Sequence, residues 1–220
     1  TSSPPMADGH PLVRVLADAA HGRFPPNDGV IDVAPAVDGR ADAMVGFTGH
    51  WVLAADIDPE LVHARLPDGD FSAPMSAVFL NWVAAQLGSR PGTFDALLCA
   101  LGTGDGMPDW LTRVDDLDHP RVARASRYRR DMQIFATADG AGVIILGRGI
   151  CGRWEIGYEV DASARGEGLG RRLVTAARAL VPNGEPVWAQ VAPGNAASLR
   201  ATLAGGFTPV AAEVLFPRRA

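Results

Sequence analysis

A run of glycines and arginines in the last third of the chain, VDASARGEGLGRRLV at residues 160–174, has the composition of an anion site. Gly166, Gly168 and Gly170 lie across the junction between a predicted strand and a predicted helix. A glycine backbone can approach a ligand closely because it has no Cβ. The first turn of a helix adds N–H groups without intrahelical partners and the positive end of the helix dipole. The stretch therefore predicts a phosphate or pyrophosphate site, and the alternative is a glycine-rich turn beside solvated arginines.

Two common phosphate motifs do not fit this stretch. A Walker loop needs a lysine before a serine or threonine, and the chain contains no lysine. The dinucleotide pattern needs an acidic residue at the end of the next strand, and the predicted strand PVWAQVA at residues 186–192 has none. The missing lysine also removes Schiff-base chemistry on a lysine side chain from the possible mechanisms.

A second motif follows at residues 195–207, NAASLRATLAGGF, in which an asparagine opens a predicted helix that ends in Gly-Phe. The pattern Arg165-x-x-Gly168-x-Gly170 after a strand, followed by this motif, resembles the acyl-CoA signature of the GNAT acetyltransferase superfamily. The resemblance covers about residues 119–217. It implies an α/β fold of the GNAT type, with a mixed, mostly antiparallel central sheet flanked by helices.

The resemblance also implies that acetyl-CoA is the co-substrate. Amides of the loop from Arg165 through Arg171 would hold the pyrophosphate, and backbone groups near Val160 would bond the pantetheine arm where two strands splay apart. Asn195 and Ser198 would reach the pantetheine from the other side. The cofactor-binding residues implied in this way are Val160, Arg165, Gly166, Glu167, Gly168, Leu169, Gly170, Arg171, Asn195 and Ser198.

In the chemistry that the resemblance implies, an amine attacks the thioester carbonyl, a base removes the amine proton and an acid protonates the leaving thiolate. The base in this family is often a glutamate on the strand before the pyrophosphate loop. Glu155 and Glu159 both lie on that strand, and strand alternation places them on one face. Glu155, which is further from the loop, is the predicted base, while Glu213 and His119 are alternatives.

The acid for the thiolate is predicted to be Tyr158. Many members of the family place a tyrosine on the last helix, seven residues after the asparagine, where this chain has Thr202. A threonine hydroxyl is a poor acid, so Tyr158, Ser198 or water would donate the proton unless thiolate protonation is unassisted. The predicted catalytic residues are thus Glu155 and Tyr158.

The elements that position these residues fall into three predicted parts. Residues 1–10 form a disordered tail, residues 11–118 form an N-terminal α/β lobe, and residues 119–217 form the acetyl-CoA-binding domain. The N-terminal lobe is either a degenerate acetyltransferase-like unit or an extension that closes the acceptor pocket. Within it, Asp38–Arg40 separates two apolar runs and predicts a hairpin.

Composition limits the possible partners. The 220 residues carry a formal net charge of −5, which favours neither nucleic acid nor an anionic membrane. The apolar runs are too short to span a bilayer and the first residues lack a signal-peptide pattern, so a cytoplasmic location is predicted. Cys99 and Cys151 lie in apolar runs and are predicted to be free, buried thiols. The histidines lack metal-ligand spacing, so no metal is predicted.

The predicted function is therefore that of a GNAT-type N-acetyltransferase, which moves an acetyl group from acetyl-CoA to an amine of a small molecule or peptide. The alternative is a catalytically silent CoA-binding regulatory or sensor module, in which Thr202 has replaced the usual acid. A longer acyl-CoA as the donor would differ only in the size of the acyl pocket. The sequence names neither the acceptor nor the oligomeric state.

Overall fold

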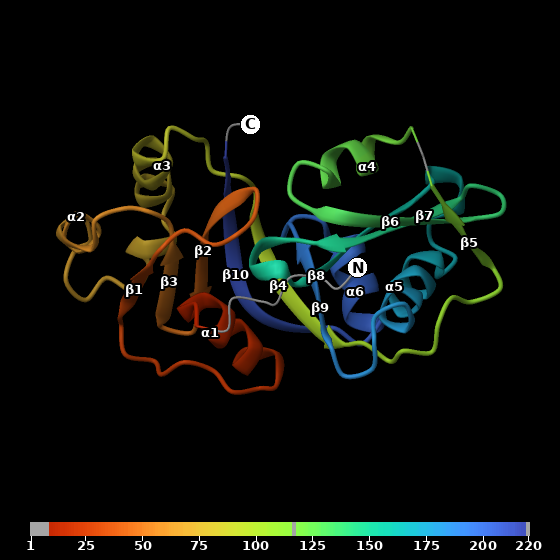
Figure 1. The fold of residues 1–220 in the computed structure, drawn as a ribbon, viewed down its shortest axis with the longest axis horizontal. Coiled ribbons are helices and arrows are strands. Elements are labelled where there is room, and N and C mark those ends of the chain that lie inside the picture. The colour runs from red at the N-terminus through yellow and green to blue at the C-terminus, as the bar shows by residue number, and fades with distance from the viewer. Residues whose placement is uncertain (1–8, 116–117, 219–220) are drawn as a thin grey trace. The chain divides into compact units, whose positions relative to one another are not determined.

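The computed structural model describes residues 9–115 and 118–218, whose elements are drawn in Figure 1. The tail predicted at residues 1–10 falls mostly outside this range. Its last residue, His10, is the N-cap of the first helix, and the Leu12 amide donates a hydrogen bond to the His10 Nδ1 atom. Among the described residues, no helix has the length and apolar character that crossing a membrane requires.

The chain divides into two compact units. Unit 1 comprises residues up to Asp95, Ile150–Gly152 and residues from Val210 onward, and unit 2 comprises residues 96–149 and 153–209. The end of the chain thus returns to the unit formed by the first half. The domain limit between residues 118 and 119 stays a prediction.

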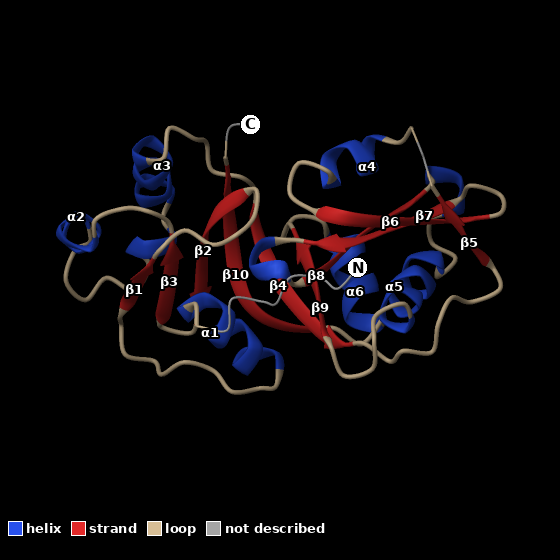
Figure 2. Ribbon diagram, viewed as in Figure 1, coloured by secondary structure: helices blue, strands red, loops and turns tan. Residues whose placement is uncertain are grey.

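Unit 1 combines a small sheet with helices, as Figure 2 shows. Its elements are α1 (Pro11–Ala20), β1 (Ile31–Ala34), β2 (Ala41–Phe47), β3 (His50–Ala54), α2 (Pro59–Arg65), α3 (Ala77–Gln86) and most of β10 (Thr208–Pro217). The strands lie in the order β1-β3-β2-β10. β1 is parallel to β3, and β2 is antiparallel to both of its neighbours. Met44, Leu53 and Phe79 lie in the core of this unit.

The hairpin predicted at Asp38–Arg40 is wrong, because β1 pairs with β3 and not with β2. The hairpin is formed by β2 and β3, which turn at Thr48 and Gly49. Gly49 has a φ of +67°, a conformation that tight hairpin turns require and glycine adopts easily. Every residue of β2 and β3 is buried, so the sequence runs apolar on both sides of the turn and conceals it.

Unit 2 contains the larger sheet. Its elements are β4 (Phe94–Leu101), β5 (Leu111–Val114), α4 (Pro120–Ala125), β6 (Arg130–Thr137), β7 (Gly142–Arg148), β8 (Trp154–Val160), α5 (Leu169–Ala179), β9 (Pro186–Val191) and α6 (Ala196–Ala204). The strands lie in the order β4-β9-β8-β7-β6-β5, and within the described part of this unit β8 and β9 alone pair in parallel. The predicted fold class, a mixed and mostly antiparallel sheet flanked by helices, is confirmed.

Helices α5 and α4 cover opposite faces of the sheet of unit 2. Ile144 of β7 belongs to the same apolar cluster as Leu173 of α5. The adjacent Ile145 points the other way and packs with Ala125 of α4. The same alternation therefore decides toward which helix each side chain of β8 points.

Candidate functional site

Strands β8 and β9 separate part-way along their length. They pair in parallel from Trp154 to Ile156 of β8, and among the described residues they pair no further. Beyond Ile156, β8 continues beside β7 as far as Val160, while β9 continues beside β4. Residues 157–160 therefore have no strand partner on the β9 side. An extended ligand that carries amide groups can take the place of that partner.

The loop after β8 reaches α5 through two left-handed glycines. Gly166 has a φ of +87° and Gly168 a φ of +81°, and a Cβ on either would meet no heavy atom within 4 Å. Gly168 is the N-cap of α5, and no side chain caps the amides of the first turn. Arg165 lies beside them, and its Nε atom donates to the Val160 carbonyl at 3.2 Å. The N-terminus of α5 thus has the amides, the dipole and the free space that bind an anion.

Three elements converge at Gly170, in the first turn of α5. A Cβ at this position would lie 3.4 Å from the Ala201 Cβ of α6, 3.7 Å from the Tyr158 ring and 3.7 Å from a Val160 methyl group. The structure therefore brings α6 and the end of β8 to the start of α5. Asn195 is the N-cap of α6, and its Oδ1 atom accepts from the Ser198 amide at 3.2 Å.

Tyr158 reaches α6 from β8. Its hydroxyl donates to the Ser198 carbonyl at 2.9 Å and lies 3.2 Å from the hydroxyl of Thr202, which is fully buried. A tyrosine hydroxyl thus lies beside position 202, where the family resemblance leads one to expect a tyrosine side chain. The hydrogen bond to Ser198 fixes the direction of the phenol, and this bond must break before the phenol can protonate a thiolate.

Glu155 lies in a buried cluster of charges on the other face of β8. The carboxylate is 1% exposed and accepts from the Nε atom of Arg129 at 3.0 Å and from the Nε atom of Arg153 at 2.8 Å. Burial raises the pKa of Glu155, but the charges and hydrogen bonds of Arg153 and Arg129 outweigh burial and hold the pKa below its ordinary value. The carboxylate is therefore ionised and engaged at both oxygens. Its role as the base stays a prediction.

The low pKa of Glu155 predicts that its ion pairs lose their stabilising effect in acid. A carboxylate with a lowered folded-state pKa stabilises the fold above its unfolded pKa, which is about 4.5 here. The stability difference between the natural protein and a Glu155→Gln variant should be complete above that pH and should shrink as the pH falls further. Urea unfolding of both proteins across the acid range measures it. A difference that stays constant down to the lowest pH would contradict the prediction.

Arg129 bridges β8 and β9 at the point where they part. Its Nη2 atom donates to the Ile156 carbonyl at 3.0 Å and to Gln190 Oε1 of β9 at 3.3 Å. Gly157 makes room for the guanidinium, since a Cβ there would lie 2.9 Å from the Arg129 Nη1 atom. Arg129 was not predicted as a site residue, because it stands in an arginine-rich run that is typical of a solvated helix face. A glycine in the middle of β8 was the available signal.

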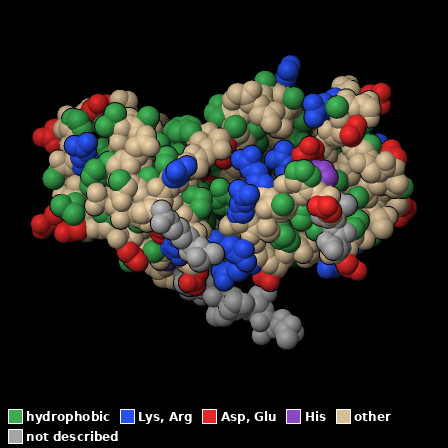
Figure 3. Space-filling view, turned by 90° about the horizontal axis from the view of Figure 1, so that it is seen from above, with side chains coloured by type: hydrophobic (Ala, Val, Ile, Leu, Met, Phe, Trp, Pro, Cys, Tyr) green, Lys and Arg blue, Asp and Glu red, His purple; other side chains and the backbone are tan. Residues whose placement is uncertain are grey.

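The alternatives to Glu155 lie in different environments. Glu159 is on the same face of β8, with its side chain 38% exposed, and accepts from the Arg121 Nε atom at 3.1 Å. His119 is the N-cap of α4, and its Nδ1 atom accepts from the Arg121 amide at 3.1 Å. Glu213 belongs to unit 1 and is 1% exposed. Figure 3 shows arginine side chains gathered on the face that is seen from above.

Comparison with known proteins finds matches among solved structures alone. No protein-family model matches the chain, and no curated protein matches its sequence. A GCN5-related N-acetyltransferase from Kribbella flavida is 18% identical over 64% of either chain, with a TM-score of 0.38. A GNAT-family acetyltransferase from Colwellia psychrerythraea is 14% identical over 65% of this chain and 63% of its own, with a TM-score of 0.36. A tandem GNAT protein from the clavulanic acid biosynthesis pathway is 17% identical over 69% of this chain and 60% of its own, with a TM-score of 0.34.

The mixed, mostly antiparallel sheet flanked by helices is the architecture expected from residues 160–174 and 195–207. The chain spans less than two thirds of the length of each of these solved structures. The fold family, the acyl donor, the acceptor and the catalytic residues are therefore proposals.

In the described part of the chain, the cysteines and the possible metal ligands do not form a further site. Cys99 and Cys151 are free and buried, as predicted, and burial raises the pKa of the Cys99 thiol to about 12. A thiol with so high a pKa forms little of the thiolate that acts as a nucleophile. Within residues 9–115 and 118–218, no group of three or more histidine, cysteine or acidic side chains could hold a metal ion.

Proposed function

We propose that unit 2 binds acetyl-CoA and transfers its acetyl group to an amine, as a GNAT-type N-acetyltransferase. The observation that carries this proposal is that β8 leaves β9 directly before the glycine loop at the start of α5. The pantetheine arm carries amides that can pair with the backbone of residues 157–160. The pyrophosphate carries the negative charge that the N-terminus of α5 attracts.

The residues at this end of α5 fit the pyrophosphate. Gly166 and Gly168 leave the space in front of the first-turn amides free of side chains. Arg165 and Arg171 are exposed beside these amides and add positive charge. Asn195 and Ser198 at the start of α6 are proposed to contact the pantetheine, because α6 meets the first turn of α5 at Gly170.

We assign the acid to Tyr158. Acetyl-CoA supplies the thioester, and the amine nitrogen forms a bond to the acetyl carbon while the bond from carbon to sulfur breaks. The thiolate that leaves needs a proton, and Tyr158 lies on the face of β8 that meets α5 and α6. Thr202 lies 3.2 Å from the phenol oxygen and keeps the side chain in place. The phenol releases the Ser198 carbonyl when it donates to sulfur.

For Glu155 the geometry favours a positioning role through Arg129. The ion pair holds the Arg129 guanidinium at the Ile156 carbonyl and at Gln190, where the two strands part. Because its carboxylate is ionised and bonded to two guanidinium groups, Glu155 is a weak acceptor for the amine proton. The more exposed Glu159, on the same face, is the alternative base.

A Gly168→Glu variant tests where acetyl-CoA binds. The new side chain puts bulk and negative charge in front of the first-turn amides, so we expect acetyl-CoA affinity to fall by about tenfold or more, or about 1.4 kcal/mol. Isothermal titration calorimetry on the full chain measures this change.

A Gly184→Glu variant is the matched control for this test. Gly184 has a φ of +80° and open space around its Cβ position, so the backbone cost is the same as at Gly168, whose φ is +81°. Gly184 lies in the loop before β9, and acetyl-CoA affinity should stay as in the natural protein. Unchanged affinity in Gly168→Glu, or equal losses in both variants, would show that the site is misplaced.

A further inference from the structure

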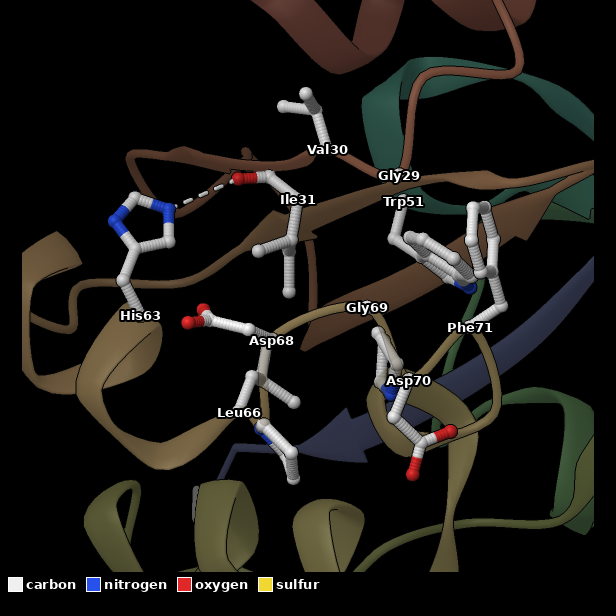
Figure 4. A pocket seen from close by; sticks show the side chains of 12 residues that line it. Gly29, Val30, Ile31, Trp51, His63, Leu66, Asp68, Gly69, Asp70 and Phe71 are labelled. Carbon is white, nitrogen blue, oxygen red and sulfur yellow. Dashed lines mark hydrogen bonds between the residues drawn. The ribbon is translucent and has the colours of Figure 1, made fainter.

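A pocket in unit 1 shares no lining residue with the site proposed above. Its volume is about 280 Å³, at the lower end of the range for small-molecule sites. Figure 4 shows that its walls come from the start of β1, from β3, from α2 and from the loop that follows α2. All of its lining residues belong to the same compact unit. The volume fits a ligand of modest size.

One wall of this pocket is aromatic. The rings of Trp51 and Phe71 lie with their centroids 6.0 Å apart at an angle of 55°. Trp51 is 5% exposed, whereas Phe71 is 56% exposed and Val30 on the rim is 43% exposed. Large apolar side chains that stay exposed around a concavity are typical of a binding surface.

The opposite side of the pocket is polar and acidic. Figure 4 shows the Asp68 carboxylate on the side of His63, away from the aromatic rings. Asp68 is exposed, and among the described residues its carboxylate has no hydrogen bond or ion pair. His63 bonds through Nε2 to the Ile31 carbonyl at 3.2 Å, and that bond requires the proton on Nε2.

The charge of the residues that line the pocket determines whether a cation or an anion binds there more favourably. Asp68 supplies a carboxylate, and no arginine is among the described residues that line the pocket. The Asp70 carboxylate accepts from the amide and the hydroxyl of Ser72, and Figure 4 shows it pointing away from Asp68 and His63. An anion would meet the Asp68 carboxylate without a compensating cation, whereas a cation would be attracted by it.

Hydrogen bonds hold these walls in place without a ligand. The Gly29 amide donates to the Gly49 carbonyl at 2.8 Å, and the Trp51 amide donates to the Val30 carbonyl at 2.9 Å. The Asp70 carboxylate accepts from the Ser72 amide at 2.9 Å. A preformed pocket of this kind loses little conformational entropy when a ligand binds.

We infer that this pocket binds a small amine with an apolar body. The ammonium group would lie at the Asp68 carboxylate, and the apolar body would lie against Trp51 and Phe71. A ring joined by a short chain to a primary amine matches this arrangement. The inference is independent of acetyl-CoA and of unit 2.

The test uses three probes of nearly equal shape: phenethylamine, phenethyl alcohol and phenylpropanoate. An NMR titration of the full chain follows the indole N–H signal of Trp51, which a Trp51→Phe variant assigns. We expect phenethylamine to bind with a Kd on the order of 1 mM, the alcohol to bind more weakly by about fivefold, and the carboxylate not to bind. Equal binding of the three probes, or no shift of the Trp51 signal, would overturn the inference.

Variants of the acidic side complete the test. Asp68→Asn should weaken phenethylamine by about fivefold and leave the alcohol unchanged. Asp38→Asn is the control, since Asp38 is an exposed carboxylate of unit 1 outside the pocket. This variant should bind phenethylamine with the same affinity as the natural protein. The Gly168→Glu variant, which is designed to lose acetyl-CoA binding, should bind phenethylamine as the natural protein does. A failure of the acetyl-CoA proposal can therefore be distinguished from a failure of this one. Amine binding that Asp68→Asn leaves intact would place the amine elsewhere and refute this site.

Discussion

Replacing Glu155 with alanine is expected to lower the free energy of unfolding by about 3–5 kcal/mol. The carboxylate is the counter-ion of two guanidinium groups, those of Arg129 and Arg153, whose side chains are 11% and 4% exposed. Without this carboxylate the two positive charges stay buried near each other, and the cost of desolvating them is no longer offset. Urea unfolding of the full chain, followed by circular dichroism, measures the loss.

Glu159→Ala is the matched control on the same strand and face. Its side chain is 38% exposed and the Arg121 partner is 35% exposed, so this pair contributes about 0–1 kcal/mol. Comparing the stability losses of the two variants therefore separates the effect of burying an ion pair from the effect of removing a negative charge. If both variants lost the same stability, or if Glu155→Ala lost less than about 1 kcal/mol, the buried cluster would not have the stabilising role assigned to it.

Replacing Tyr158 with phenylalanine is expected to lower kcat for acetyl transfer by about a hundredfold, with a small change in the KM for acetyl-CoA. The variant removes the hydroxyl that we propose as the proton donor and keeps the ring beside Gly170. The hydroxyl forms a bond to the Ser198 carbonyl, so a loss of about 1 kcal/mol of stability should accompany the change. Release of thiol from acetyl-CoA, measured against a panel of small primary amines, amino acids and short peptides, gives the rates.

Tyr128→Phe is the control, because Tyr128 is the other of the two tyrosines and lies in the segment after α4. Its kcat should equal that of the natural protein. A Tyr158→Phe variant that keeps full kcat would remove Tyr158 from the chemistry and leave water or Ser198 as the donor. Tight binding of acetyl-CoA without thiol release on the whole panel would instead support a silent sensor module.

Local signals in the sequence were sufficient for most elements of the fold. The asparagine at position 195 predicted the start of α6, and the strand alternation in residues 154–160 predicted β8. The prediction failed where both faces of a strand are buried. β2 and β3 show no alternation of polar and apolar residues, and the turn that joins them is only two residues long. Leu111–Val114 was missed as a strand because it follows a glycine-rich loop and is short.

The candidate site was predictable only where it is local in sequence. Residues 160–174 carry the glycines and the helix start together, so the anion cradle could be proposed from spacing alone. The cluster of Arg129, Glu155 and Arg153 joins segments that spacing cannot relate, and it gives Glu155 an environment that the sequence does not reveal. The same reason hid the pocket of unit 1, where Trp51 and Phe71 meet across 20 positions of the chain.

The central claim is that acetyl-CoA lies along the unpaired end of β8 and at the N-terminus of α5. Amide hydrogen exchange of the full chain, with and without saturating acetyl-CoA, tests it most directly. We predict slower exchange at residues 157–160 and at residues 166–171, with unit 1 unchanged. Slower exchange confined to other segments, or no change on addition of acetyl-CoA, would contradict the claim.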